Sequence, residues 1–366
     1  MAGGLLALCT VFVVIAAAVP GSTLAAWGER IALLSVGFQQ PEGGAELLSE
    51  RLDRQPAKGN VSVGSTTSAS TVGTAATQGK PGAGEQQPGS DVPAVTPSTV
   101  PNRGPKGGVV EEQRLTIGSS FIDGVAVKNS SGTTVDIAAQ LKIKPKLTIK
   151  KTSEPQVLIV HTHTTESYMT YYAGYYNDAD VARSKDEKRN VCAVGEVVAA
   201  QLRAAGIGVI HDTAVHDSPQ YTGAYDRSAA TVQKNMKEHP TIQVVIDLHR
   251  DAIMRNASTK VKPTVTIGGR KAAQMMIITG VLDTKALPHP NWQENLRLTL
   301  RLQQALHTQY EGIIRPMSLV GSRYNQHLAP GAMLVEVGTD ANTLDEAVYS
   351  GEILGKTLAQ VLKTLQ

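Results

Sequence analysis

The pattern of apolar and polar positions divides the chain into four parts. Residues 1–35 are mostly apolar, and residues 36–113 contain few large apolar side chains. From residue 155 onward, short apolar runs alternate with longer mixed segments, which is typical of an α/β domain. We therefore expect a signal or membrane-anchor segment at 1–35, a flexible linker at 36–113, a short β-rich preface at 114–154 and the main folded domain at 155–366.

Within the main domain, short apolar runs rich in β-branched residues predict buried strands, and longer periodic segments predict helices. Gly206 follows the first helical segment and is a typical C-cap. The strands are expected at Val157–Val160, Ile207–Ile210, Val244–Ile246, Gln274–Gly280 and Met333–Val335, and the helices at Asn190–Ala205, Arg227–His239, Asn295–Gly312 and Thr343–Leu365.

The N-terminal segment has two interpretations. The first 19 residues carry no charged side chain, and Leu5–Val19 is apolar apart from Thr10. Such a segment is either a cleaved signal peptide or an uncleaved membrane anchor of about 15–20 residues. Its length favours the anchor, and in both cases the rest of the chain leaves the cytoplasm. Leu8 precedes Cys9 where a lipidation signal has a small residue, so a lipoprotein is not expected.

Composition excludes some classes of protein. The linker is rich in Gly, Ser, Thr and Pro and cannot bury enough surface to offset its conformational entropy, so we expect a flexible tether. A net charge of +3 does not indicate a nucleic-acid-binding protein. Cys9 and Cys192 lie in different parts of the chain, so no disulfide framework is expected, and Cys192 is interpreted as a small buried residue.

Polar residues follow the carboxyl ends of three expected strands, where α/β sheets bind ligands. His161, His163 and Glu166 follow the first of these strands, His249 follows another, and Glu336 lies in the last. His163, Glu166 and His249 provide the three protein ligands of a hydrolytic zinc ion. Glu336 is the candidate general base, because a carboxylate in an apolar strand needs a cation beside it.

The roles of several neighbouring residues stay open. His161 is an alternative zinc ligand, a partner of one, or a packing residue. Arg250 either grips a substrate carbonyl or carboxylate, or forms a structural ion pair with Asp251, which is also a candidate substrate-binding residue. Asn325 is expected to line the cleft, and Asp186 could simply favour a helix N-terminus. The remaining histidines are expected at surface or loop positions: His211, His216, His239, His289 and His307.

Several segments resemble the stage II sporulation protein P family of cell-wall amidases. They are HTHTTESY, DEKRNVCAVG, YDRSAATV, VVIDLHRDA and LAPGAMLVEVGTDANTLDEA, and the resemblance extends from about Gly124 to the C-terminus. The family is related to zinc-dependent N-acetylmuramoyl-L-alanine amidases. The resemblance therefore implies that residues 155–366 are a zinc amidase domain, a three-layer α/β/α fold with a twisted, mostly parallel six-stranded sheet.

The resemblance also implies roles for individual residues. The closing pattern of the amidases matches Pro330, Val335, Glu336, Gly338 and Asn342 here. Their catalytic glutamate then corresponds to Glu336, and Asn342 becomes a candidate substrate-binding residue. The strand-end histidine of the amidases corresponds to His249.

The resemblance leaves the carboxylate ligand open. In the amidases the ligand is a glutamate that opens the next helix in a Glu-x-x-x-Asn pattern, and this chain has Asp186 before Asn190 at that place. The reach of a glutamate and its spacing from His163 favour Glu166, with Asp186 as the alternative.

The resemblance implies hydrolysis of the amide between N-acetylmuramic acid and L-alanine in peptidoglycan, with cleavage of peptide crosslinks as an associated activity, during engulfment in sporulation. The implied partners are a stage II sporulation protein D-like transglycosylase and a stage II sporulation protein M-like membrane protein. The implied location is the cell membrane, with one anchor and an extracytoplasmic domain. The residues alone indicate a zinc hydrolase of an amide bond, and the alternatives are a zinc carboxypeptidase-like wall peptidase and a non-catalytic wall-binding scaffold.

Overall fold

The computed structural model describes residues 107–115, 121–177 and 182–366. Its larger sheet is formed by β2 (Phe121–Ile122), β3 (Val125–Asn129), β4 (Thr152–Val160), β6 (Ile207–His211), β7 (Val244–Asp251), β11 (Met275–Gly280), β12 (Met317–Val320) and β13 (Gly331–Thr339). Within the described residues the order is β2-β3-β12-β11-β13-β7-β4-β6, with five parallel and two antiparallel pairs. The α/β class and the mostly parallel sheet are confirmed.

The sheet has eight strands in the described part of the chain, where six were expected. The difference arises because the predicted preface at 114–154 is part of the same sheet. Its strand β3 pairs in parallel with β12, and β2 pairs with β3. β12 itself was not predicted, and Ser318 interrupts its apolar residues.

Three central strands, β4, β7 and β13, are parallel neighbours and define the functional edge. β7 is buried along its whole length. Val160 of β4 pairs with Asp247, and Glu336 of β13 pairs with His249. Because parallel neighbours end at the same edge of a sheet, the polar residues that follow these strands meet there, as predicted.

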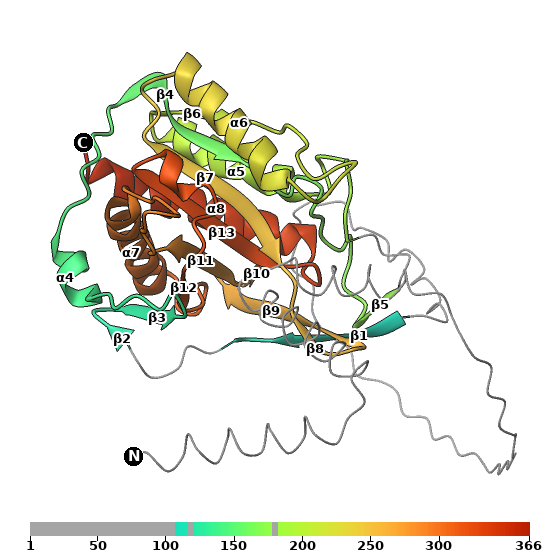
Figure 1. The fold of residues 1–366 in the computed structure, drawn as a ribbon. Coiled ribbons are helices and arrows are strands. Elements are labelled where there is room, and N and C mark those ends of the chain that lie inside the picture. Colours follow the sequence, from blue (N-terminus) through green and yellow to red (C-terminus); the bar gives the residue numbers. More distant parts are fainter. Residues whose placement is uncertain (1–106, 116–120, 178–181) are drawn as a thin grey trace, which may run out of the picture.

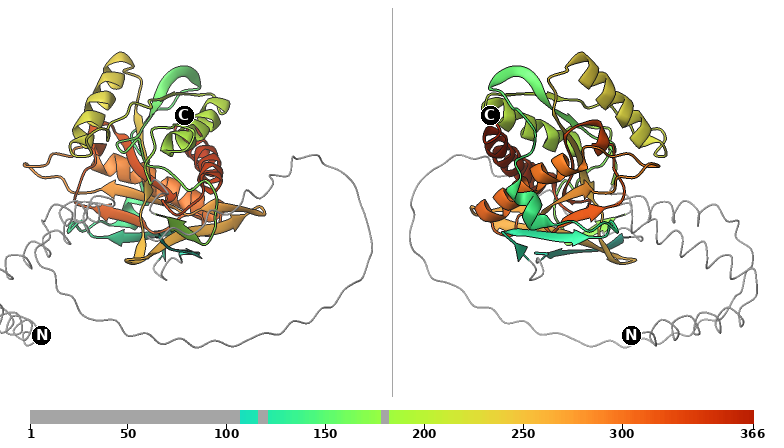
Figure 2. Two further views of the ribbon diagram at one scale, coloured as in Figure 1. Left: turned by 90° about the vertical axis from the view of Figure 1, so that its right-hand side faces the viewer. Right: turned by 60° about the vertical axis from the view of Figure 1, so that its left-hand side comes forward.

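Helices cover both faces of the large sheet, as the expected three-layer architecture requires (Figures 1 and 2). They are α4 (Ile137–Lys142), α5 (Val191–Ala204), α6 (Ala224–Glu238), α7 (Trp292–Gln309), α8 (Leu344–Lys363) and the short 3₁₀-helix η1 (Gln326–Leu328). Val157 and Ile159 of β4 pack with α5, α7 and α8 in the main core, whereas Leu158 and Val160 pack with α6 on the other face. This alternation decides on which face each strand-end side chain lies.

A second sheet was not predicted. It contains β1 (Gly107–Gln113), β5 (Tyr175–Asn177), β8 (Met254–Asn256), β9 (Thr259–Ile267) and β10 (Arg270–Ala273), in the order β10-β9-β1-β5 with β8 paired to β9 (Figure 1). The predicted linker therefore extends too far toward the C-terminus, because residues 107–113 form β1. Only the distant pairing of β1 with β9 makes this segment a strand, and local composition does not show such a pairing.

Lys262 joins the second sheet to the rest of the fold. The side chain is fully buried, and its Nζ lies 2.7 Å from Oε1 of Glu346 on α8 and 3.2 Å from Oε2 of Glu112 on β1. The ammonium also lies 3.7 Å from the ring centroid of Tyr172. A buried charge with these partners fixes β9 and β1 against α8.

The predicted membrane segment at 1–35 and most of the predicted linker lie outside the described residues. Among the helices in the described ranges, none combines the length and the apolar character that crossing a membrane requires.

Candidate metal and catalytic site

Four predicted residues lie together at the carboxyl edge of β4, β7 and β13. Nδ1 of His249 is 3.4 Å from Oε2 of Glu166, and the same oxygen accepts a 3.1 Å hydrogen bond from the backbone N–H of Arg250. The ring of His163 is nearly perpendicular to that of His249, with centroids 5.4 Å apart. Glu336 pairs with His249 across the two strands, and all four side chains are buried.

His163 is enclosed by aromatic rings. Tyr221 stacks on the imidazole at 4.4 Å between centroids with planes 7° apart, and Tyr225 contacts it edge-on. Burial lowers the pKa of His163 to about 3, with further lowering by His249 and Arg183 against the opposing effect of Glu166. Nδ1 of His163 is buried and has no hydrogen-bond partner among the described residues. A neutral imidazole with an available lone pair is the form that binds a metal.

Glu336 lies in a strongly perturbed environment. Burial raises its pKa to about 8, and the negative charges of Asp251 and Glu166 add to this, while His249 and Arg315 oppose it. Its Oε2 is buried without a hydrogen-bond partner among the described residues. A carboxylate in this position is stabilised by a cation nearby.

A chain of polar contacts leads from His249 to α6. Nε2 of His249 is 2.9 Å from Oδ1 of Asp247, whose other oxygen accepts a 2.6 Å hydrogen bond from the hydroxyl of Thr162. That hydroxyl is 2.7 Å from Oγ of Ser228, to which Asn325 donates at 3.0 Å. Asn325 was predicted to bind substrate, but here its amide is fixed against α6. It contacts the site indirectly, through these two hydroxyls and through the carbonyl of Tyr225, to which it donates at 2.7 Å.

Arg250 and Asp251 form internal contacts. Arg250 donates from Nε to the carbonyl of Ser167 at 3.2 Å and from Nη2 to that of Ala182 at 2.7 Å, so it fastens the loop after β4 to β7. Oδ2 of Asp251 is 2.8 Å from Nη1 of Arg315, and both residues are buried. The structural ion pair considered for Arg250 and Asp251 is thus replaced by one between Asp251 and Arg315.

Asn342, the second predicted substrate-binding amide, is fully buried. Its Oδ1 accepts a 2.9 Å hydrogen bond from the backbone of Thr339, and its Nδ2 donates to Glu346 at 3.0 Å. These contacts stabilise the turn from β13 into α8, so the side chain of Asn342 points into the interior of the fold. Gly338 completes that turn with φ of +70°, and a Cβ there would lie 2.7 Å from Oδ1 of Asn342.

The two candidate carboxylate ligands are in different environments. Asp186 is exposed, and its Oδ1 accepts a 3.0 Å hydrogen bond from the backbone of Lys188. Glu166 is fully buried, and its carbonyl accepts a hydrogen bond from Val191 at the N-terminus of α5. The loop therefore folds back and brings Glu166, rather than Asp186, beside both the helix N-terminus and His249.

The alternative ligand His161 lies apart from this group. Its Nδ1 is 2.8 Å from the carbonyl of Leu248, and its Nε2 is 2.9 Å from Nε2 of His211. His211 was expected at the surface or in a loop, but its side chain is only 4% exposed. Burial lowers the pKa of His161 to about 3 and raises that of Cys192, which lies beside the pair, to about 12.

Sequence comparison identifies the family. A family profile described as stage II sporulation protein P matches residues 110–359, which is more than half of the chain. The chain belongs to the stage II sporulation protein P family. The stage II sporulation protein P of Bacillus subtilis (strain 168) is 30% identical over 201 residues, which cover 52% of this chain and 47% of that protein. The match thus spans about half the length of the curated relative.

Solved structures of amidases show a weaker similarity. The N-acetylmuramoyl-L-alanine amidase AmiC2 of Nostoc punctiforme has a TM-score of 0.35 at 10% identity, over 58% of this chain and 97% of that one. The CwlD amidase of Clostridioides difficile, solved in complex with the GerS lipoprotein, has a TM-score of 0.36 at 11% identity, over 57% and 98%. Similarities of this size do not establish a common reaction.

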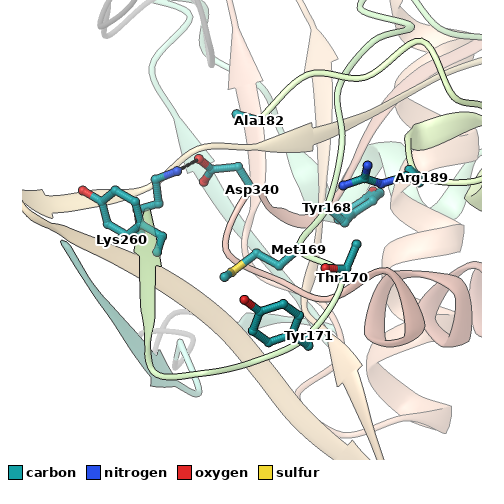
Figure 3. Close-up of a pocket in the computed structure, with 9 residues that line it drawn as sticks. Tyr168, Met169, Thr170, Tyr171, Ala182, Arg189, Lys260 and Asp340 are labelled. Atoms are coloured by element: carbon teal, nitrogen blue, oxygen red, sulfur yellow. Dashed lines mark ion pairs between the residues drawn. The ribbon is translucent and has the colours of Figure 1, made fainter. Parts of the chain in front are cut away.

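In this member of the sporulation protein P family, a small pocket of about 30 Å³ lies beside the segment that follows Glu166 (Figure 3). Tyr168 fastens this segment to β13, because its hydroxyl donates at 3.0 Å to the carbonyl of Val337. Lys260 and Asp340 form a 2.6 Å ion pair across the pocket. The lining residues are Tyr168, Met169, Thr170, Tyr171, Tyr176, Ala182, Arg189, Lys260 and Asp340.

Sequence reasoning missed several residues of the site. Asp247 stands two positions before His249 and therefore shares its face of β7, a signal that strand alternation provides. Tyr225 lies in the first turn of α6 and opens the segment YDRSAATV, which the sequence analysis used only for the family resemblance, and Tyr221 precedes that segment. Arg183, whose guanidinium lies 4.8 Å from the ring centroid of Tyr221, has no signal in the sequence.

Proposed function

We propose that the protein is a zinc-dependent peptidoglycan hydrolase that cleaves the amide between N-acetylmuramic acid and L-alanine. The observation that carries the proposal is the convergence of His163, Glu166 and His249 on one sheet edge beside the buried carboxyl of Glu336. Membership of the sporulation protein P family supports a substrate in the cell wall.

The types of residue that converge here suit a zinc ion. Two imidazoles and one carboxylate are a donor set of hydrolytic zinc sites. His163 Nδ1 is buried without a partner among the described residues, as a ligand atom without its ion would be. The cost of keeping Glu336 ionised falls if a cation is close. When bound, zinc supplies a Lewis acid that polarises the amide carbonyl and lowers the pKa of water.

Residues of the chain orient the proposed ligands and transfer the proton of the attacking water. Asp247 lies at Nε2 of His249 and directs Nδ1 toward Glu166. The stacked ring of Tyr221 fixes the plane of His163. Glu336 takes the proton of the attacking water and delivers it to the departing amine of L-alanine. We assign Arg250 a positioning role, because its guanidinium is bonded to loop carbonyls.

Products released from purified peptidoglycan test the proposal. An amidase releases stem peptides that begin with a free L-alanine amine, which mass spectrometry identifies. Release of single amino acids would instead indicate the carboxypeptidase alternative. Binding to the wall without release of any fragment would indicate the scaffold.

We further infer the location and partners from the family. Residues 1–35 would anchor the protein in the cell membrane with the hydrolase domain outside, near a protein D-like transglycosylase and a protein M-like membrane protein. Membrane fractionation of the full chain and of a variant lacking residues 1–35 tests the anchor. Equal amounts of both in the soluble fraction would contradict it.

A further inference from the structure

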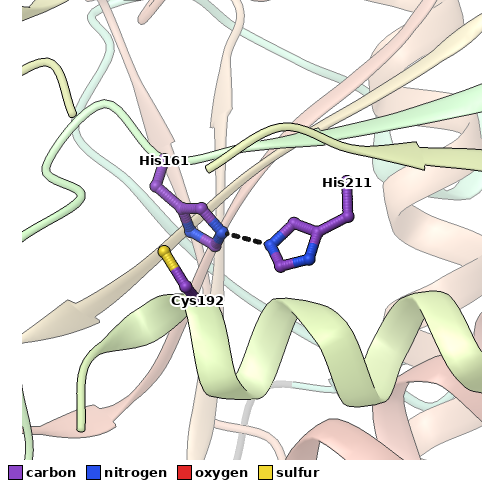
Figure 4. Close-up of side chains that lie close together, drawn as sticks. All are labelled: His161, Cys192 and His211. Carbon is purple, nitrogen blue, oxygen red and sulfur yellow. Dashed lines mark hydrogen bonds between the residues drawn. The ribbon is translucent and has the colours of Figure 1, made fainter. Parts of the chain in front are cut away.

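A second group of ligand-type side chains lies outside the proposed catalytic site (Figure 4). His161 follows β4, His211 ends β6, and Cys192 lies in the first turn of α5. One ligand atom from each of these residues lies within 4.8 Å of the other two. The side chains of His161 and His211 are almost completely buried, and Cys192 is a buried free thiol.

This cluster faces the opposite side of the sheet from the catalytic residues. His161 follows Val157 and Ile159 in the alternation of β4, and both of these pack in the core under α5. His249 and Glu336 alternate with Leu248 and Val335, which belong to that same core, so they face away from it. The two groups therefore cannot share one ion.

The hydrogen bonds of the two imidazoles leave both Nε2 atoms unprotonated, so that two lone pairs repel each other. Nδ1 of His161 faces the carbonyl of Leu248 at 2.8 Å, and Nδ1 of His211 faces a carboxylate oxygen of Glu196 at 3.0 Å. Both partners can only accept, so each Nδ1 carries the hydrogen of its ring. The two Nε2 lone pairs then point at each other across 2.9 Å. An atom that accepts both lone pairs resolves this repulsion.

The backbone of α5 leaves room for such an atom beside the two imidazole rings. Gly195 of α5 stands against the two rings, and a Cβ there would lie 2.6 Å from Nε2 of His211 and 2.8 Å from Nε2 of His161. Only glycine lets α5 approach the imidazole pair this closely. An imidazole whose Nδ1–H is held by a carbonyl or carboxylate is the usual arrangement of a metal-binding histidine.

We propose that His161, His211 and Cys192 bind a second divalent cation of the zinc class, separate from the catalytic site. Two imidazole nitrogens and a thiolate suit zinc or cobalt(II). On binding, the sulfur–hydrogen bond of Cys192 breaks, the proton passes to solvent, and the sulfur lone pair binds the metal. The ion links β4, β6 and α5 immediately before the loop that contains His163. This inference does not depend on the proposed hydrolase function.

Cobalt(II) loading of the full chain tests the site with a signal that only thiolate ligation produces. The protein is stripped with a chelator and reloaded, and the near-ultraviolet thiolate-to-cobalt band and the bound metal are measured. The wild type and the Cys9→Ser control are expected to show the band. Cys192→Ser is expected to lose it together with one metal equivalent, whereas His249→Ala loses the other equivalent and keeps the band.

Glu196→Gln provides a second variant on an exposed side chain, in case Cys192→Ser does not fold. It is expected to weaken cobalt binding about 10- to 100-fold, because the partner of His211 Nδ1 loses its charge. Absence of the band in the wild type would overturn the proposal and indicate a proton shared between the rings, and a band that survives Cys192→Ser would overturn it and indicate ligation by Cys9. A single equivalent that depends on Cys192 but not on His249 would instead refute the catalytic zinc site.

Discussion

Replacing Lys262 with methionine tests whether the second sheet is an integral part of this fold. The substitution keeps the unbranched shape of the side chain and removes its charge. Glu346 and Glu112, which lie 2.7 Å and 3.2 Å from the ammonium, lose their buried partner. Breaking a buried ion pair by removing one partner costs about 3–5 kcal/mol, because the remaining charge is uncompensated. That is a large part of the roughly 5–15 kcal/mol by which domains are stable.

Urea unfolding followed by circular dichroism measures this loss. The control is Lys271→Met, which removes a neighbouring lysine whose Nζ lies 2.6 Å from Glu112 but whose side chain is 52% exposed. An exposed pair contributes about 1 kcal/mol or less, so the control should change little. Adding Glu346→Gln to Lys262→Met should recover part of the stability, because the uncompensated charge is removed. A loss below 1 kcal/mol for Lys262→Met would refute the reasoning.

Three further predictions concern the site. In metal-free protein, the lowered pKa values of His161 and His163, both about 3, mean that stability is fully present above the unfolded value of 6.5 and falls below it. In a Glu336→Gln background, which removes the opposing effect of the raised Glu336 pKa, going from pH 7 to pH 5 should cost about 2 kcal/mol per histidine in urea titrations, and equal stabilities would contradict the burial argument. Asp247→Asn should weaken catalytic-site zinc binding about 10- to 100-fold in chelator competition, and unchanged affinity would remove Asp247 as a partner of His249. Gly338→Ala should destabilise the protein by about 1–3 kcal/mol, because φ is +70° there and the new Cβ meets Asn342; an unchanged melting temperature would refute this strain.

Local sequence pattern was sufficient for the central strands and for the edge at which the site lies. The switch from Val157–Val160 to polar residues marks a strand end, and parallel neighbours bring such ends together. Local pattern was not sufficient where contacts are distant in the sequence. Pairing of β1 with β9 joins residues about 150 positions apart, and the segment was therefore assigned to the linker.

The same limit applies to the site. Reach and spacing favoured Glu166 over Asp186 as the carboxylate ligand, but the sequence could not show that the loop folds onto the N-terminus of α5 and brings Glu166 beside His249. The pairing of His161 with His211 depends on the parallel register of β4 and β6, in which Ile159 lies opposite His211. Neither the spacing of these residues nor their types could reveal that contact.

The most direct test of the central claim is a joint measurement of zinc content and released wall fragments for the wild type and Glu336→Gln. We expect the variant to keep the zinc content of the wild type and to bind peptidoglycan, while its release of stem peptides with a free L-alanine amine falls about 10²- to 10⁴-fold. Full activity in the Glu336→Gln variant, or a wild type that binds no zinc, would contradict a metal hydrolase with Glu336 as its base.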